Sequence, residues 1–200
     1  MRYFVALVAL TLYGLANAQI ISIGPFTGAF QEGYETQRRG EFLPSYTVFS
    51  GQGTVNQVGS GQGLHITSSW GFFYTVYPHT GSAFMGGAGV NYEYVFNTPA
   101  VRFGGYFATN ADLADATVTF FDENGNQIGG AFTASAPLGQ WAWNGWQTNG
   151  PGIKRVRIVA NNRFNGFIMN DTMQYDPVPE PATLLAVAAG FAALAARRRK

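Results

Sequence analysis

Three tryptophans in the C-terminal third of the chain have the side-chain type and the spacing that could bind a sugar. Trp141, Trp143 and Trp146 form the pattern W-x-W-x-x-W, and on a β-strand Trp141 and Trp143 share one face. An exposed indole ring stacks on the apolar face of a sugar, while Asn144 and Gln147 could hydrogen-bond its hydroxyl groups. The alternative is that the three rings fill the hydrophobic core of a β domain.

Hydrolytic chemistry finds little support in the same sequence. Glycoside hydrolases need two carboxylates across a cleft, and the acidic residues of this chain show no spacing that singles out a pair. His65 and His79 are the only histidines and there is no cysteine, so the sequence does not indicate a zinc site. A G-x-S-x-G motif is also missing, which disfavours a serine hydrolase. We therefore predict that the protein is not an enzyme.

The composition predicts an all-β body that holds these side chains in place. Aromatic residues make up 16% of the chain and charged residues 12%, so there is enough apolar material for a core, and 26 residues are glycine. Residues 19 to 177 show no extended helical periodicity. Because cysteine is absent, no disulfide can stabilise the fold.

Short strand candidates alternate with turn-forming residues along this body. The tetrapeptide Ser-Gly-Gln-Gly occurs at 50–53 and again at 60–63, and Asn124-Gly125 is a strong hairpin signal. The pattern predicts a jelly-roll-like β-sandwich of about ten strands over residues 19–176. The expected strands are 46–49, 54–58, 64–67, 72–77, 90–96, 100–108, 117–121, 127–132, 140–147, 156–160 and 167–174.

The first 18 residues have the pattern of a secretory signal peptide. A basic residue, Arg2, precedes an apolar run from Phe4 to Leu15, and Ala16-Asn17-Ala18 forms a cleavage site before Gln19. We expect a signal helix over residues 1–18 that signal peptidase removes during export. The alternative, a buried N-terminal helix, does not account for the cleavage site.

The C-terminal residues form a second terminal signal. Val178-Pro179-Glu180-Pro181 belongs to a linker at 177–181, and residues 182–196 lack both charge and proline. As a helix, this apolar segment would be about 22 Å long, whereas a bilayer core measures about 30 Å. Four cations follow at 197–200 and would stay on the cytoplasmic side. A permanent tail anchor is the alternative interpretation.

This tail resembles the PEP-CTERM sorting signal, in which a Pro-Glu-Pro motif, a hydrophobic helix and a basic cluster follow one another. The resemblance covers residues 178–200 and assigns Pro179, Glu180 and Pro181 to the recognition motif. It implies that an exosortase, a membrane protease-transpeptidase of Gram-negative bacteria that make extracellular polysaccharide, processes the tail. The hydrophobic helix and basic tail at 182–200 would then contact the membrane transiently.

Three stretches of the body resemble carbohydrate-binding-module-like β-sandwich domains. They are AVRFGGYFATN, then VTFFDENGNQIGG followed by WAWNGWQTNGPGIKRVRIV, and NGFIMNDTMQY. Similar jelly rolls often bind a structural calcium ion, and the resemblance implies Glu35 and Asp171 as its ligands in this chain. Thr172 stands where that family usually has a second acidic residue.

The charge distribution excludes a nucleic-acid partner. Five of the 12 basic residues lie in the terminal segments, so residues 19–178 hold 7 Lys and Arg against 10 Asp and Glu. A body with a net charge near −3 has no basic patch with which to release counterions from nucleic acid. We therefore expect an exported protein of the cell surface or extracellular matrix, tethered to the inner membrane as an intermediate, whose sandwich binds extracellular polysaccharide. The alternatives are a polysaccharide-active enzyme and a structural matrix protein without a ligand.

Overall fold

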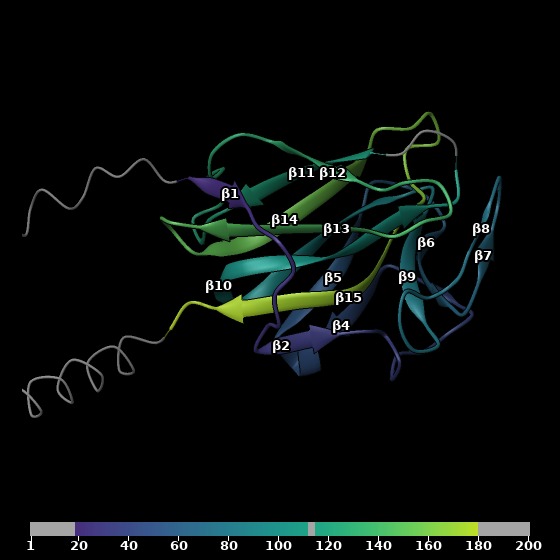
Figure 1. Cartoon of the computed structure of the whole chain (residues 1–200), viewed down its shortest axis with the longest axis horizontal. Helices are drawn as coiled ribbons and strands as arrows, with labels where there is room; N and C mark the ends of the chain where they lie inside the picture. Colours follow the sequence, from purple (N-terminus) through teal and green to yellow (C-terminus); the bar gives the residue numbers. More distant parts are fainter. Residues whose placement is uncertain (1–18, 112–114, 180–200) are drawn as a thin grey trace, which may run out of the picture.

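The computed structural model describes residues 19–111 and 115–179, and these residues form an all-β sandwich, as predicted (Figure 1). The signal peptide at 1–18 and the tail at 182–200 lie outside the described residues, together with Glu180 and Pro181. The described part contains no α-helix and one 3-10 turn, η2 (Phe49–Gly51).

One long strand, β10 (Asn91–Thr109), belongs to both layers of the sandwich. Its residues 91–96 pair with β5 and β14, whereas its residues 100–109 pair with β13 and β15. The register shifts between Val95 and Ala100, where the strand changes partners. The first layer runs β4 (Ser45–Val48), β5 (Gly53–Val58), β10, β14 (Ile153–Ala160), β11 (Asp115–Phe121) and β12 (Phe132–Ser135).

The second layer is formed around the other half of β10. β13 (Ala142–Thr148) pairs with it on one side and β15 (Ile168–Pro177) on the other. The remaining strands of this layer are β1 (Ile20–Ser22) beside β13, β2 (Phe30–Glu32) beside β15, and the row β9 (Phe84–Ala88), β6 (Gly63–Thr67) and β3 (Phe42–Leu43).

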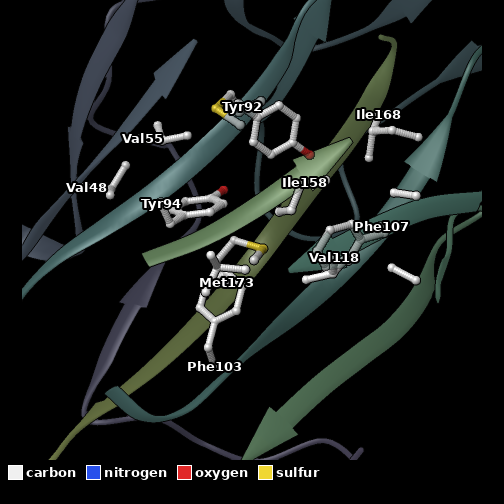
Figure 2. Close-up of a cluster of buried hydrophobic side chains, with 14 of the residues drawn as sticks. Val48, Val55, Tyr92, Tyr94, Phe103, Phe107, Val118, Ile158, Ile168 and Met173 are labelled. Atoms are coloured by element: carbon white, nitrogen blue, oxygen red, sulfur yellow. The ribbon is translucent and has the colours of Figure 1, made fainter. Parts of the chain in front are cut away.

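The core lies between the two layers, and Figure 2 shows its aromatic and aliphatic side chains meeting there. Tyr94 and Phe96 from the first half of β10 approach Phe103 from its second half, with ring centroids 5.2 and 5.5 Å apart. Phe96 also stacks on Tyr175 of β15 at 4.6 Å. Burial of so many large rings between two sheets supplies the main stabilisation of a domain that has no disulfide.

Three strand predictions were wrong. Residues expected as two strands at 90–96 and 100–108 form one strand, β10, and Pro99, which lacks an N–H group, lies at its register shift. The strand expected at 72–77 is instead part of a small hairpin of β7 (Trp70–Gly71) and β8 (Thr75–Val76), whose tip is formed by residues 72–74. The strand expected at 127–132 begins only at Phe132, since Gly129 has a positive φ of 66° that breaks the extended run.

Two turn predictions hold in the structure. The Ser-Gly-Gln-Gly segment at 50–53 closes the β4–β5 hairpin, and the copy at 60–63 carries the chain from β5 in one layer to β6 in the other. At Asn124-Gly125 the chain reverses, because the N–H of Asp122 donates to the carbonyl of Asn126 at 2.9 Å and Phe121 pairs with Gln127.

Candidate functional site

The outer surface of β10 and β13 carries a row of aromatic rings. Trp143 on β13 pairs directly with Tyr106 on β10, and their ring centroids are 5.4 Å apart. Both side chains are partly exposed, because alternate residues of these strands face away from the core. Phe26, from the segment between β1 and β2, contacts the ring of Trp143 edge-on at 5.8 Å.

The indole of Trp143 is held in one position on the sheet. A β-carbon at Gly104 would lie 3.0 Å from this ring, and one at Gly145 would lie 2.8 Å from it, so the ring sits where only glycine leaves room. The Nε1 group donates a hydrogen bond to the backbone carbonyl of Ile23 at 3.1 Å. A ring fixed in this way loses little conformational entropy when a ligand binds to it.

His79 and Trp141 extend the aromatic row. The imidazole of His79 stacks on Tyr106 with a centroid distance of 3.6 Å, and Trp141 meets His79 edge-on at 6.3 Å. Burial lowers the pKa of His79, so the imidazole is uncharged at neutral pH. We call Phe26, Trp143, Tyr106, His79 and Trp141 together the tryptophan face. Every ring in it is partly exposed and none carries a charge at neutral pH.

The three tryptophans of the W-x-W-x-x-W pattern do not share one environment. Trp141 and Trp143 contact the same His79–Tyr106 pair from its two sides. Trp146 points the other way, into the core, where it is 2% exposed and lies 5.4 Å from the ring of Phe120. The core interpretation therefore holds for Trp146, and partly exposed Trp141 also packs on the buried ring of Phe84 at 5.7 Å. Trp141 and Trp143 remain the candidate sugar-binding rings.

The side chains of Asn144 and Gln147 differ in whether they can hydrogen-bond a ligand. The side-chain amide of Asn144 donates to the carbonyl of Ser135 and accepts from its N–H, at 2.8 and 2.9 Å, so it ties the β12 and β13 segments together. Gln147 is partly exposed on the same side as Trp143. A shallow hollow of about 110 Å³ adjoins Trp143. Of the two predicted hydrogen-bonding residues, Asn144 therefore serves the fold, whereas Gln147 is partly exposed.

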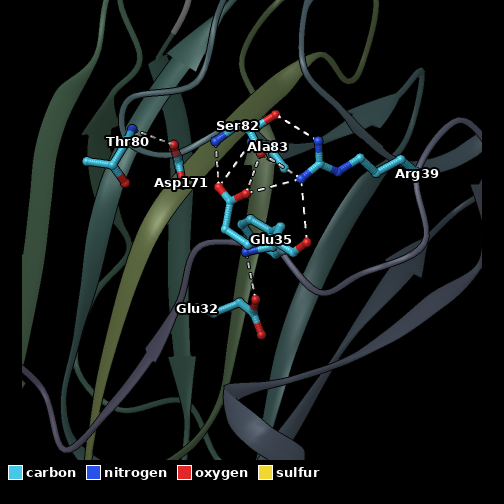
Figure 3. Close-up of polar contacts among 8 residues, drawn as sticks. Glu32, Glu35, Arg39, Thr80, Ser82, Ala83 and Asp171 are labelled. Atoms are coloured by element: carbon cyan, nitrogen blue, oxygen red, sulfur yellow. Dashed lines mark hydrogen bonds and ion pairs between the residues drawn. The ribbon is translucent and has the colours of Figure 1, made fainter.

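The two carboxylates assigned to calcium by resemblance hold one segment of the chain, residues 79–83 (Figure 3). Asp171 accepts hydrogen bonds from the N–H groups of His79 and Thr80, at 2.8 and 3.1 Å. Glu35 accepts from the N–H groups of Ser82 and Ala83, at 2.7 and 3.1 Å, and forms an ion pair with Arg39. Together they fix the segment that places His79 on Tyr106.

A calcium ion at this pair would have to replace those contacts. Calcium takes six to eight oxygen ligands, and both oxygens of Glu35 and of Asp171 already face N–H or O–H donors. The described residues also contain no group of three or more His, Cys, Asp and Glu side chains that could hold a metal. The residues as arranged do not provide a ready calcium cage, and calcium binding stays a prediction.

The pKa values of these two carboxyl groups move in opposite directions. Burial raises the pKa of Asp171 to about 6, although three backbone N–H groups favour its charged form. Hydrogen bonds from Ser82 lower the pKa of Glu35, which stays close to solvent. Glu35 is therefore charged at neutral pH, and its charge contributes to the raised pKa of Asp171.

A hollow of about 490 Å³ lies beside Glu32 and Glu35. Both carboxylates accept hydrogen bonds that stabilise the fold. Glu32 accepts from the N–H groups of Tyr34 and Phe49, at 2.7 and 3.0 Å. No aromatic ring lines this hollow. Its geometry therefore favours structural roles for the two carboxylates over acid–base catalysis.

The sorting motif follows the last strand. β15 ends at Pro177, and Pro179 is exposed, while Glu180 and Pro181 lie outside the described residues. Within the part of the chain that the structure describes, no helix has the length and hydrophobicity needed to cross a membrane. The first residue of the motif is thus accessible from solvent at one end of the sandwich.

Comparison with known proteins identifies the tail. Residues 177–200 match the family model of the PEP-CTERM protein-sorting motif. The chain is therefore an exported β-sandwich protein with a sorting signal at its C-terminal end. This signal directs processing by an exosortase at the membrane, toward the cell surface or the extracellular space. No curated protein matches the chain.

Several solved structures resemble the fold. The CBM22-1 xylan-binding domain of Xyn10C from Paenibacillus barcinonensis is 14% identical, with a TM-score of 0.47 over 78% of this chain and 99% of that domain. TmCBM61, solved with β-1,4-galactotriose, is 13% identical, with a TM-score of 0.43 over 74% of this chain and 95% of the module. The enzymatically active domain of tailspike protein 4 from bacteriophage CBA120 is 16% identical, with a TM-score of 0.31, and the chain covers 20% of it. At these identities the likeness concerns the fold alone.

The sequence did not reveal three members of the tryptophan face, Phe26, Tyr106 and His79. Tyr106 lies in the alternating run 101–106, and this alternation places it on the face of the strand opposite to Phe103. The sequence does not show that β13 pairs with this strand and brings Trp143 beside Tyr106. His79 stacks on Tyr106 while its backbone N–H donates to Asp171, which lies more than 90 residues away in the chain. Long-range contacts of this kind leave no local pattern.

Proposed function

We propose that this protein is exported and sorted to the bacterial cell surface or extracellular matrix, where its β-sandwich binds polysaccharide through the tryptophan face. The observation that carries the proposal is the fixed, uncharged row formed by Trp143, Tyr106, His79 and Trp141 on the outside of β10 and β13. Aromatic rings held at fixed positions stack on the apolar faces of sugar rings, and partly exposed Gln147 offers a hydrogen-bonding amide.

The sorting signal supports the same proposal. A PEP-CTERM tail directs the sandwich to the outside of the cell, which is where an extracellular polysaccharide would meet it. The net negative charge of residues 19–178 also favours an uncharged ligand over a polyanion, since like charges repel. Export and surface chemistry thus agree on a neutral polymer outside the cell.

The two alternatives make different demands on the structure. A structural matrix protein without a ligand would bury all four tryptophans, but only Trp146 is buried, and Trp70, Trp141 and Trp143 are partly exposed. An enzyme acting on polysaccharide would need two free carboxylates across a cleft. In the hollow of about 490 Å³, Glu32 and Glu35 are both used in structural hydrogen bonds.

Binding is tested with the full chain on glycan arrays and in pulldowns with matrix polysaccharide, and the tryptophan fluorescence is followed during titration. We expect binding by the wild-type protein and a loss of about tenfold or more in affinity for Trp143→Ala. Ile21→Ala, at an exposed position of β1, is the matched control and should bind like the wild type. If neither arrays nor pulldowns show binding, the carbohydrate proposal fails, while the assignment of the sorting signal stands.

A further inference from the structure

A second aromatic surface lies at the end of the sandwich where β7 and β8 form a hairpin. Phe72 and Phe73 are each 53% exposed, Tyr74 is 57% exposed and Tyr77 is 65% exposed. We call these four side chains the hairpin surface. Aromatic rings left this exposed in a cluster lose the stabilisation that burial would give, and such patches mark binding sites in soluble proteins.

The rings of the hairpin surface are presented on a fixed backbone. Trp70 pairs with Val76 in the hairpin, and the N–H groups of Phe73 and Tyr74 both donate to the carbonyl of Asn110, at 2.9 and 3.2 Å. These bonds tie the tip of the hairpin to the end of β10. The backbone of the tip is therefore fixed to the sandwich, and its side chains project from a defined position.

Stacking behind the tip orients one ring in particular. Phe72 lies parallel to Phe167, with an interplanar angle of 2° and a centroid distance of 5.2 Å. Phe164 meets Phe72 edge-on at 5.2 Å and itself carries the guanidinium of Arg163 at 4.8 Å from its centroid. Phe72 thus keeps about half of its surface in solvent while a layer of rings supports it from behind.

The hairpin surface adjoins the tryptophan face. The carbonyl of Tyr77 accepts a hydrogen bond from Trp141 Nε1 at 2.9 Å, so the last residue of one surface touches the last residue of the other. Tyr74 packs on Gly139, two residues before Trp141, where a β-carbon would collide with its ring. Aromatic rings therefore continue from one surface to the other through Tyr77 and Trp141.

The surrounding sequence sets the charge of the partner. Between Glu41 and Glu93 the chain contains no Asp, Glu, Lys or Arg, and the same holds from residue 124 to residue 153. These two stretches supply all four rings of the hairpin surface and three of the tryptophan face, His79, Trp141 and Trp143. A lipid headgroup or a polyanion would be matched by several basic side chains. Arg163, whose guanidinium lies on Phe164, is a single cation beside the hairpin surface. An aromatic surface within stretches that lack charge instead matches a neutral chain of sugar rings.

The position of the hairpin fits a partner outside the membrane. In Figure 1, β7 and β8 lie at the end of the sandwich opposite to β1 and to the C-terminal end of β15. The match to the PEP-CTERM family model starts at Pro177, where β15 ends. The hairpin surface therefore faces away from the end of the sandwich that leads to the membrane-processed tail, and a polymer can reach it during and after sorting.

We propose that the hairpin surface is a second contact site for an uncharged polysaccharide, continuous with the tryptophan face, so that one domain contacts a long stretch of polymer. This inference rests on the proposed function, because it assumes that the ligand is a polysaccharide. It adds the charge class of that ligand, the residues of a second site, and a preference for long chains over short oligosaccharides.

The test compares Phe72→Ala/Phe73→Ala with wild type and Trp143→Ala, using the full chain. The probes are neutral polysaccharides (xylan, β-1,4-galactan, mannan and dextran), short oligosaccharides of those that bind, and alginate as an acidic polymer. We expect the double variant to lose about tenfold or more in affinity for the neutral polymer and to bind short oligosaccharides like the wild type. Because both rings are half exposed and lose their contacts with Phe164 and Phe167, the melting temperature should fall by only a few degrees, and Ile21→Ala is the matched exposed control.

The outcomes separate this inference from the proposed function. Equal affinity of wild type and double variant for the neutral polymer, with weaker binding by Trp143→Ala, would overturn the second site and leave the proposed function standing. Preference for alginate would overturn the charge class. Phosphatidylethanolamine–phosphatidylglycerol vesicles and sedimentation velocity complete the test. Vesicle binding or dimerisation that is lost in the double variant, without an effect on polysaccharide, would assign the surface to a membrane or a second copy and refute the inference.

Discussion

Trp143 and Trp146 are three residues apart and should respond in opposite ways to truncation. Trp146 is 2% exposed and packs among core rings, 6.4 Å from Phe103 and 6.2 Å from Phe107 between centroids. Replacing a buried tryptophan by alanine costs about 3–5 kcal/mol. For a domain of this size that corresponds to a fall of about 6–20 °C in melting temperature. Because domains are stable by only about 5–15 kcal/mol, Trp146→Ala should be severely destabilised.

Trp143→Ala should lose much less stability than Trp146→Ala. It should, however, lose the stacking contact that the indole ring makes with the polysaccharide. Its hydrogen bond to the carbonyl of Ile23 is worth about 0.5–1.5 kcal/mol, and its edge contacts with Phe26 and Tyr106 add a similar amount. The sum is about 1–3 kcal/mol, and partial exposure places the expected effect at the lower end.

The assay combines thermal melting, followed by circular dichroism, with titration of a bound polysaccharide. Trp146→Phe is the control, since it keeps an aromatic ring in the core and should recover most of the stability lost in Trp146→Ala. A melting temperature of Trp146→Ala close to that of the wild type would show that the core assignment is wrong. A loss of stability in Trp143→Ala as large as in Trp146→Ala would show that the tryptophan face is part of the core.

Three further predictions concern the carboxylates and the sorting motif. Burial raises the pKa of Glu32, so the contribution of this group to stability is present below about pH 4.5 and is lost as the pH rises. Chemical denaturation should show that the wild type loses stability relative to Glu32→Gln between about pH 4 and 7. If the free energy of unfolding changed with pH equally in both proteins, this prediction would be refuted. Glu35→Gln should lower the melting temperature, because it weakens the hydrogen bonds to Ser82 and Ala83. If EDTA lowered the melting temperature of the wild type and left that of Glu35→Gln unchanged, calcium binding would be supported. If EDTA had no effect on either protein, this would count against calcium binding. Alanine substitution of residues 179–181 should leave the tail uncleaved in the native cells, read by mass spectrometry of both termini, and normal cleavage would contradict the role of the motif.

The class of fold was predictable because it depends on local patterns. Alternation of side chains, glycine-rich turns and the Asn124-Gly125 signal all act within a few residues, and these parts of the prediction hold in the structure. The short strands β1, β2, β3 and β9 were not predicted, since each has at most five residues and depends on a partner elsewhere in the chain. Pairing between strands that lie far apart in the sequence cannot be predicted from the residues of any single segment.

Residues 72–77 show why the second aromatic surface was misread. A run of Phe, Tyr, Thr and Val is typical of a strand that packs in a core, so the sequence predicted a strand there. In the structure the first three residues of the run form the tip of the β7–β8 hairpin and stay exposed. β-propensity reports how well a side chain fits a half-buried pleated surface, and it does not tell which rings face solvent. The lack of charge between Glu41 and Glu93 was the signal that could have drawn attention to this region.

The acidic pair and the tryptophan face are connected through one short segment. Asp171 binds the backbone of His79 and Thr80, and Glu35 binds the backbone two residues further on, so both ends of the segment are fixed to the sandwich. His79 can stack on Tyr106 at 3.6 Å only while this backbone is held in place. The two carboxylates that the resemblance assigned to a metal therefore act, in this arrangement, as positioning residues for the uncharged aromatic row.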